Sequence, residues 1–425
     1  MKIKNLTLKT FNFLEILRPL RYILSFSNIK KIKKADVLIM CHDYQRSFTI
    51  NGKKYSPILD TVGENLTRLG ISHSYISTPY SNPRILNFNN YVNINGYIVR
   101  AHTLDKLISL YNFYLYKIKT RNFHLINAWN LILKKTEASV VISIMPPVEM
   151  CVAASQNKII SVDMQHGIIS NQGYYSLNYR EWLNQEGWPS YIATWNDISK
   201  NSIDKMTLLK TKAINCGNLW VNRIKTNNPR DSILRDDINE LGVMVNNKIV
   251  ILVTLQWGDI FNKNTTLGIP NNIYNIIKKN EIDCNWWIRF HPVLVGEMSM
   301  PKIDKLMNNE FKGLNNIFWR HSTKMALPLL FKHAHLHITL ESAATSEASL
   351  FGVPTALLGE DSNALIEWFR HEIDSGDAKV VENNEASIVS WINDSMYGIR
   401  PKKNSTVNVD DLFCDFDEFI IKCVK

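Results

Sequence analysis

Three loops of this 425-residue chain combine side chains that could hold a phosphate and move a proton. In the most informative one, an apolar strand over 336–340 leads into small and hydroxyl-bearing residues and then a short amphipathic helix. Backbone N–H groups at a helix start and hydroxyl donors both bind anions. The loop therefore predicts a phosphate site, and its candidate residues are Glu341, Ser342, Thr345 and Ser346, with Glu341 or Glu347 accepting from ribose or sugar hydroxyls.

The second loop, Arg289-Phe290-His291-Pro292, follows an apolar strand over 286–290. Pro292 cannot continue a strand, so it fixes the turn and leaves His291 at the strand end. Side chains alternate along a strand, so Arg289 and His291 share one face, where both can meet a phosphate. Gln256 follows another predicted strand and is expected at the edge of the same cleft.

The third loop, at the end of a strand over 159–164, contains Asp163, Gln165, His166 and Gly167. A glycine lets the backbone turn sharply beside His166 and present its imidazole. Imidazole takes up a proton near neutral pH, which suits deprotonation of an acceptor hydroxyl. Asp163 either orients His166 or acts as the base itself, and one sequence does not separate these roles. Gln165 and Gly167 are predicted to line the acceptor side.

Each loop also has a purely structural interpretation. Ser342 is a normal helix N-cap, and His291 and His166 are residues that turns accommodate. The histidines at 333, 335 and 337 look like a metal tract but are interpreted as a helix end that runs into a buried strand. Six widely spaced cysteines without a CxxC pair predict buried, reduced thiols. We therefore predict no metal site and no cofactor.

Strands and helices alternate along the chain, and the strands are short, continuous and rich in Val and Ile, as in parallel sheets covered on both faces. Predicted strands are 36–41, 73–77, 140–145, 159–164, 191–195, 214–217, 249–255, 286–290, 317–319, 336–340, 355–358 and 379–381. Predicted helices include 58–69, 104–120, 273–279 and 364–369, with a short one at 232–241 in a polar seam.

This length exceeds one core, so the pattern predicts an α/β fold with two doubly wound domains. The predicted divisions are a leader at 1–34, an acceptor domain at 35–225, a nucleotide-donor domain at 245–400 and a tail or helix at 401–425. Ligands of such sheets lie outside the carboxyl ends of the strands, so we expect the active site in the cleft between the domains.

The formal charge of +10 is concentrated in the leader, which has nine basic residues against one acid. Interleaved leucines and phenylalanines make the leader basic and amphipathic, which suits an anionic bilayer surface. A poorly ordered segment that merely packs on the domain is the alternative. No apolar run reaches the ~18–20 residues of a membrane span. The rest of the chain lacks an RNA-binding signature, so nucleic acid is not an expected partner.

Taken together, these motifs resemble those of GT-B glycosyltransferases, in particular the bacterial surface-polysaccharide group with Kdo transferases, polysialyltransferases and CDP-glycerol transferases. His291-Pro292 matches the HP motif of that group, and Ser342 with Thr345 or Ser346 matches its Ser/Thr motif. Gln165-His166-Gly167 stands where the group carries its catalytic base, with His as in the teichoic-acid type and not paired acids. The resemblance covers about 35–381.

The resemblance implies a GT-B fold, two Rossmann-like domains facing each other across a cleft, and a metal-independent reaction. It implies transfer of a sugar from a nucleotide-activated donor, CMP-linked donors included, to a hydroxyl of a growing or lipid-linked capsule or lipopolysaccharide O-antigen glycan. The expected location is the cytoplasm, at the inner face of the cytoplasmic membrane. The alternatives are a CDP-glycerol-type polyol-phosphate transferase, a sugar-nucleotide epimerase of the same fold, and a non-catalytic nucleic-acid or glycan-binding protein.

Overall fold

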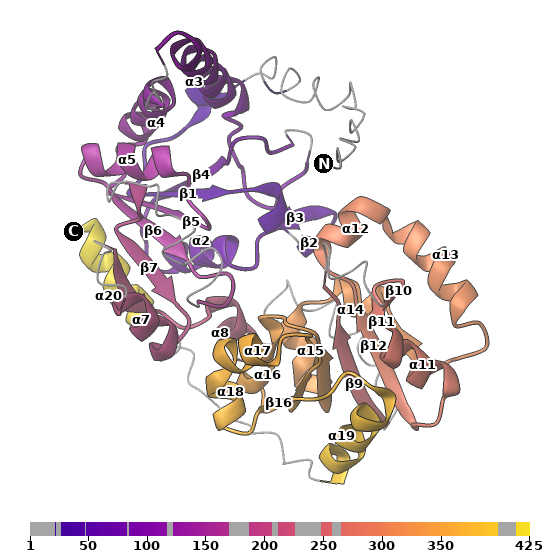
Figure 1. The fold of residues 1–425 in the computed structure, drawn as a ribbon. Coiled ribbons are helices and arrows are strands. Elements are labelled where there is room, and N and C mark those ends of the chain that lie inside the picture. Colours follow the sequence, from indigo (N-terminus) through magenta and orange to yellow (C-terminus); the bar gives the residue numbers. More distant parts are fainter. Residues whose placement is uncertain are drawn as a thin grey trace, which may run out of the picture.

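The structure is a computed structural model, described here for residue 22 and residues 27–46, 48–82, 85–116, 122–169, 187–205, 211–225, 248–256, 265–397 and 414–425. Figure 1 shows two α/β domains, each with a central sheet between helices. Each sheet has six strands, and all of their pairings are parallel. The predicted fold class, two doubly wound α/β domains, is confirmed.

The N-terminal sheet has the strand order β4-β1-β5-β6-β7-β8. Its strands are β1 (Val37–Cys41), β4 (His73–Ser77), β5 (Val140–Ser143), β6 (Ile160–Met164), β7 (Tyr191–Thr194) and β8 (Lys212–Asn215). The covering helices are α2 (Leu59–Arg68), α3 (Asn95–Tyr116), α4 (Phe123–Thr136), α5 (Val148–Gln156), α7 (Asp197–Asp204) and α8 (Leu219–Lys225). Because β1 and β5 are fully buried, helices must cover both of their faces.

The C-terminal sheet has the order β13-β12-β9-β14-β15-β16. Its strands are β9 (Ile249–Thr254), β12 (Cys284–Arg289), β13 (Ile317–Phe318), β14 (Leu336–Thr339), β15 (Thr355–Leu357) and β16 (Ala378–Val380). Its helices are α11 (Asn271–Lys279), α12 (Pro292–Met298), α13 (Met300–Glu310), α14 (Arg320–Lys324), α15 (Leu327–His333), α16 (Ala344–Leu350), α17 (Ser362–Trp368), α18 (Arg370–Asp374) and α19 (Glu385–Tyr397). The strand order reverses between β9 and β14, which is where such sheets bind ligands.

Nearly every predicted strand is present within a residue or two, and β8 begins two residues before its predicted start. Helix α3 begins at Asn95, well before the predicted 104. Two short antiparallel hairpins were not predicted: β2 (Phe48–Ile50) with β3 (Lys53–Tyr55), and β10 (Thr265–Thr266) with β11 (Ile269–Pro270). The helix expected at 232–241 and most of the leader lie outside the described residues.

The two domains share an apolar cluster. Hairpin β2–β3 contributes Phe48 and Tyr55, helix α8 contributes Trp220, and the C-terminal sheet contributes Leu252 and Trp287. Arg223 on α8 donates to the Tyr55 hydroxyl at 2.6 Å and pairs with Glu64 on α2. This burial of large apolar side chains fixes how the second sheet meets the first.

The end of the chain returns to the N-terminal domain. Helix α20 (Cys414–Val424) buries Phe416 and Ile420 in the same core cluster as Val37 of β1, and the Phe419 ring packs against Tyr191 of β7 at 5.0 Å. Figure 1 shows this helix beside β7 and α7. The terminal segment that the sequence assigns to a tail or helix therefore completes the first domain.

One buried histidine links three strands at the reversal point of the C-terminal sheet. His337 of β14 is fully buried; its Nε2 lies 2.9 Å from the Thr254 hydroxyl of β9, and its Nδ1 lies 3.1 Å from the Thr355 hydroxyl of β15. Burial lowers the pKa of His337 to about 3, so the ring is neutral. The expectation of a helix end at His333 and a buried strand at 337 is confirmed.

Replacing His337 with Leu should therefore destabilise the fold. The variant leaves two buried threonine hydroxyls without their imidazole partner, which costs about 2–4 kcal/mol of unfolding free energy. Chemical denaturation measures the change. His371→Leu, at an exposed position of α18, is the control and should change the unfolding free energy by less than about 0.5 kcal/mol. Equal effects of the two variants would contradict the linking role of His337.

Candidate functional site

The loop after β6 is held in place by Gln165. This buried side chain donates through Nε2 to the carbonyl of Gly167 at 2.8 Å and to the Ser199 hydroxyl at 3.2 Å. Its Oε1 accepts from the backbone N–H of Trp195 at 2.7 Å. Both the nitrogen and the oxygen of the amide thus bond to the protein, so Gln165 positions the loop and is not assigned a ligand contact.

Asp163 is 1% exposed and accepts from the backbone N–H of Met145 at 2.9 Å. Met145 follows β5 and has a φ of 52°, a left-handed conformation that a non-glycine residue adopts only when it is stabilised. The carboxylate therefore ties the loop after β5 to β6. Of the two roles that the sequence leaves open for Asp163, this geometry favours a structural one, since a base must reach the acceptor.

His166 is half-buried at the carboxyl end of the N-terminal sheet. Burial lowers its pKa to about 4, so the imidazole is neutral at physiological pH and has a nitrogen lone pair. Gly167 does not have the positive φ that a sharp glycine turn needs. Among the described residues, its two chain neighbours aside, no atom would lie within 4 Å of a Cβ at this position, so the glycine leaves space on the described side of the loop.

The loop that carries His166 contacts the C-terminal domain. Ile168, two residues further on, packs against the cluster of Leu357, Leu365 and Phe369 from β15, α17 and the start of α18. The carboxyl edge of the first sheet thus meets the carboxyl edge of the second. The Ile168 contact therefore joins the loop that carries His166 to β15 and α17 of the C-terminal domain.

Three predicted residues follow neighbouring strands of the C-terminal sheet. His291 comes after β12, Gln256 after β9 and Ser342 after β14, and β9 lies between the other two. The carboxyl ends of parallel strands meet at one edge, so these side chains surround the point where the strand order reverses. The Gln256 side-chain Nε2 is buried and has no hydrogen-bond partner among the described residues, which leaves one donor unused within them.

His291 caps helix α12, and Pro292 is the first residue of that helix. The Nδ1 atom of His291 accepts from the Val293 N–H at 3.3 Å, so Nδ1 has no proton and Nε2 carries it. Burial, with help from the Arg289 charge, lowers the pKa of His291 to about 4. His291 is thus a neutral imidazole that donates through Nε2, as a phosphate oxygen requires.

Arg289 is bound to the protein backbone. Its Nη1 donates to the carbonyls of Ser322 and Met325, each at 2.6 Å, and so ties β12 to the connection between α14 and α15. Its charge also acts on Glu347 of α16, whose pKa burial raises to about 7 while Arg289 opposes the rise. An acid poised near neutral pH is a frequent feature of binding and catalytic sites.

The hydroxyl loop before α16 divides into separate roles. The Ser342 hydroxyl accepts from the Ala344 N–H at 3.2 Å, and the Ser342 carbonyl accepts from the Thr345 N–H at 3.0 Å. Thr345 is fully buried, and its hydroxyl has no partner in the protein. Ser346 donates to the buried Glu372 of α18 at 2.5 Å. Of the three hydroxyl groups predicted to bind phosphate, that of Ser342 is therefore the best placed.

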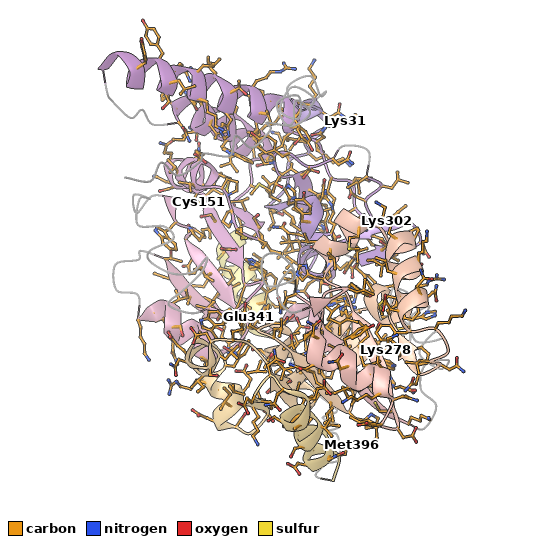
Figure 2. All side chains as sticks on the ribbon, turned by 45° about the vertical axis from the view of Figure 1, so that its right-hand side comes forward. Lys31, Cys151, Lys278, Lys302, Glu341 and Met396 are labelled. Carbon is orange, nitrogen blue, oxygen red and sulfur yellow. The ribbon has the colours of Figure 1, made fainter. Side chains whose placement is uncertain are left out.

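Helix α16 is only seven residues long, so side chains matter more here than the helix dipole. It ends at Leu350, and a Schellman cap follows: Gly352 has a φ of 66°, its N–H donates to the Ser349 carbonyl, and the Val353 N–H donates to the Ala348 carbonyl. Figure 2 labels Glu341 at the boundary of the two domains. Burial, with the nearby Asp361 and Glu360, raises the pKa of Glu341. A carboxylate is an acceptor and repels a phosphate when ionised, so Glu341 is better suited to contact with hydroxyls.

Metal ligands do not gather anywhere in the described residues, since no group of three or more His, Cys, Asp or Glu side chains could hold an ion. Among the cysteines with described side chains, four are buried, and burial raises the pKa of Cys41, Cys216 and Cys284 to about 12. These thiols stay protonated at physiological pH and are poor nucleophiles.

A further part of the site follows β1. The Tyr44 ring is 68% exposed and stacks on His42 at 4.8 Å, and the Gln45 amide donates to the Ile144 carbonyl after β5 at 3.1 Å. This bond spans the point where the N-terminal strand order reverses. In the sequence, Asp43-Tyr44-Gln45-Arg46 is only a turn-like segment after β1, and the topology places it at the end of a strand that lies between β4 and β5.

No protein-family model matches this sequence, and no curated protein matches it. Solved structures do. UDP-GlcNAc 2-epimerase from Neisseria meningitidis bound to UDP-GlcNAc is 14% identical with a TM-score of 0.54, over 91% of this chain and 99% of that one. The enzyme of Methanocaldococcus jannaschii in complex with UDP-GlcNAc and UDP is 16% identical with a TM-score of 0.55, over 91% and 98%.

The wall teichoic acid polymerase TagF is 13% identical with a TM-score of 0.55, over 96% of this chain and 93% of that one. At these identities the likeness concerns the fold. The GT-B fold expected from the sequence motifs is therefore confirmed.

The neutral state of His166 has a measurable consequence. The unfolded imidazole has a pKa near 6.5, above the folded value of about 4, so below pH 6.5 only the unfolded chain takes up this proton. Above pH 6.5 the protonation of His166 does not affect the free energy of unfolding. As the pH falls from 6.5 toward 4, it lowers the free energy of unfolding by up to about 1.4 kcal/mol per pH unit.

Denaturation of wild type and His166→Asn at several pH values isolates this contribution, because all other groups titrate in both proteins. The stability difference should shift in favour of the variant between pH 6.5 and 4.5 and stay constant between pH 7 and 8. A difference that is flat over the whole range would show that the histidine is not held neutral.

Proposed function

We propose that this chain is a metal-independent transferase of the GT-B fold that moves a sugar from a nucleotide-activated donor to a hydroxyl of a bacterial surface glycan. The observation that carries the proposal is the position of one neutral imidazole at the carboxyl end of each sheet, in two domains that are in contact through Ile168. His166 has an acceptor nitrogen at the carboxyl edge of one sheet, and His291 has a donor nitrogen at the carboxyl edge of the other.

In the proposed reaction the acceptor hydroxyl attacks the anomeric carbon of the donor sugar. His166 takes the hydroxyl proton as the new C–O bond forms. The bond between the anomeric carbon and the phosphate oxygen breaks, and its electron pair leaves with the nucleotide. His291 donates through Nε2 to the departing phosphate, in the role that preorganised donors play in charge stabilisation. Open space beside Gly167 leaves room for the acceptor.

The donor nucleotide is expected over the reversal point between β9 and β14. There the unused Gln256 amide donor can meet a base or a phosphate, and Ser342 can meet a phosphate oxygen. Glu347, with its pKa of about 7, is the proposed acceptor for ribose hydroxyls and becomes a stronger one when ionised. Arg289 supports this arrangement electrostatically through its charge near Glu347 and His291.

A polyol-phosphate transfer is the second candidate, favoured by the likeness to the wall teichoic acid polymerase over 96% of this chain. Epimerisation of a sugar nucleotide is the third, favoured by the likeness to UDP-GlcNAc 2-epimerases. We further propose that the acceptor is lipid-linked and that the protein works at the inner membrane face, where the basic leader attracts anionic lipid. Capsule and lipopolysaccharide glycans are the acceptor classes in view.

Donor screening by thermal shift, followed by turnover, tests the function. The nucleotide series should contain UDP-, CMP- and CDP-linked sugars and CDP-glycerol, and the true donor should raise the melting temperature most. Nucleotide release that requires added glycan and lengthens it supports glycosyl transfer. Transfer from CDP-glycerol supports the polyol-phosphate candidate. Conversion of the donor into an epimer without any acceptor would overturn the transferase.

In the same assay, His166→Asn should lower the turnover rate at least about 100-fold, because it removes the proton acceptor. The melting-temperature rise caused by the nucleotide should be unchanged, since His166 lies on the other domain. Asp163→Asn is the matched control: its amide oxygen still accepts from Met145, so the rate should stay within about tenfold. The reverse pattern would make Asp163 the base.

Donor binding should depend on pH through Glu347. Its pKa of about 7 means that the carboxylate is ionised at pH 8 and mostly protonated at pH 6, where it is a weaker acceptor for ribose hydroxyls. Affinity for the sugar nucleotide found in the screen should therefore fall as pH drops from 8 to 6, as titration calorimetry can measure. Such donors carry diester phosphates that do not titrate in this range.

Glu347→Gln should weaken binding about tenfold at pH 8 and remove the pH dependence. Glu367→Gln, at an exposed position of α17, is the control and should leave both the affinity and its pH dependence unchanged. A pH dependence that persists in Glu347→Gln would show that another group contacts the donor and titrates near pH 7.

A further inference from the structure

The second half of α3 presents a row of large apolar side chains to solvent. The exposed fractions are 44% for Leu104, 60% for Leu107, 66% for Leu110, 63% for Tyr111 and 80% for Tyr114. Spacings of three and four residues place these side chains along one side of the helix. We call this row the α3 surface. Contiguous apolar exposure of this kind is typical of an interaction site and unusual for a solvent-facing helix.

The row lies beyond the part of α3 whose side chains enter the core of its domain. Ile98 and Val99 in the first turns are buried, and Ile98 shares a core cluster with Ile126 and Trp129 of α4. Beyond Leu104 the helix extends past this core. Figures 1 and 2 both show α3 at the outer end of the N-terminal domain, on the side away from the C-terminal domain.

Positive charge surrounds the α3 surface. Arg100 and Lys106 of α3 are exposed, whereas Asp105, the only acid in its sequence, is 4% exposed. The Asp105 carboxylate accepts from the backbone N–H groups of His124 at 3.1 Å and Leu125 at 2.8 Å, so it caps α4. The sequence of α4 contains no acid, and the segment 117–121 between the helices reads Lys-Ile-Lys-Thr-Arg. The surface therefore complements an anionic partner.

The basic leader starts from the same end of the domain. The Ser27 hydroxyl accepts from the Tyr97 N–H at the start of α3 at 2.7 Å, and the Asn28 N–H donates to the Asn93 carbonyl at 3.0 Å. The 26 residues that precede Ser27 include five Lys or Arg and one acid. Lys31, labelled in Figure 2, lies at the same upper edge of the domain as α3. The described chain that follows the leader therefore begins beside the start of α3.

We infer that the α3 surface docks on a lipid bilayer that contains anionic lipid. The leucines enter the boundary between headgroups and acyl chains, the tyrosines lie at headgroup level with their hydroxyls hydrated, and the cations bind lipid phosphates. No helix of the described residues is long and apolar enough to cross a membrane, so α3 lies on the bilayer. This inference goes beyond the proposed transfer reaction and does not depend on it.

A second copy of the chain is a poorer occupant. Two copies that pair through this face would bring the same patch together, because a two-fold interface is self-complementary. Arg100 and Lys106 of one copy would then face the same cations of the other, which opposes association. Anionic headgroups neutralise these charges instead.

Vesicle sedimentation with the full chain tests the inference. Wild type should bind vesicles of phosphatidylcholine with phosphatidylglycerol and bind phosphatidylcholine alone much more weakly. Leu107→Gln combined with Leu110→Gln should lower the partition coefficient at least about tenfold. Both positions are exposed, so the variant should keep the wild-type melting temperature. The control is Leu306→Gln on α13, whose side chain is 37% exposed on the other domain, and it should bind as wild type does.

Wild-type-like binding by the double variant, or a wild type that binds neither vesicle, would overturn the inference. Size-exclusion chromatography without lipid tests whether a second copy of the chain binds the α3 surface. A wild-type dimer that becomes a monomer in the double variant would show that the α3 surface is an interface between copies. Vesicle binding does not depend on the transfer reaction. The membrane inference and the proposed function can therefore fail independently of each other.

Discussion

The hydrogen bonds of one neutral imidazole set the geometry on which the C-terminal site depends. His337 joins Thr254 of β9 to Thr355 of β15 across β14, so it fixes three strands at the point where the strand order reverses. Gln256 and Ser342 follow two of these strands within a few residues. A one-residue slip of β14 would turn its side chains to the opposite face. The buried, three-strand link penalises such a slip, and the ligand-binding loops keep their spacing.

A second constraint acts between the domains. Hairpin β2–β3 and α8 pack their aromatic side chains onto the second sheet, and Ile168 packs onto β15 and α17. The two domains are therefore joined by two separate apolar contacts. Since each buries apolar area, relative rotation of the domains must either preserve them or lose the free energy of that burial. Hydrogen bonds of Gln165 fix the His166 loop to the N-terminal domain, and the Ile168 contact fixes the same loop against the C-terminal domain.

The sequence predicted the architecture well because the strands are continuous apolar runs between turn residues, and such runs have few alternative structures. Individual roles were less predictable. Ser346 bonds Glu372, which is distant in sequence, and Arg289 bonds the carbonyls of Ser322 and Met325, so both depend on packing. Gly167 was expected in a sharp turn but has open space beside it instead. Hairpin β2–β3 was missed because strands of three residues give too little alternation to recognise.

Burial explains how two histidines with the same pKa of about 4 can have different proposed roles, His166 as a proton acceptor and His291 as a hydrogen-bond donor. Desolvation keeps both rings neutral, and a neutral imidazole has one donor and one acceptor nitrogen. At His291 the Val293 N–H donates to Nδ1, so Nε2 carries the proton, and the proposed role uses Nε2 as the donor to an anion. At His166 the proposed role requires the acceptor nitrogen instead. The negative charge of a bound phosphate favours a protonated imidazole. Because His166 lies on the other domain from the proposed phosphate site, it can stay neutral until it takes the proton of the acceptor hydroxyl.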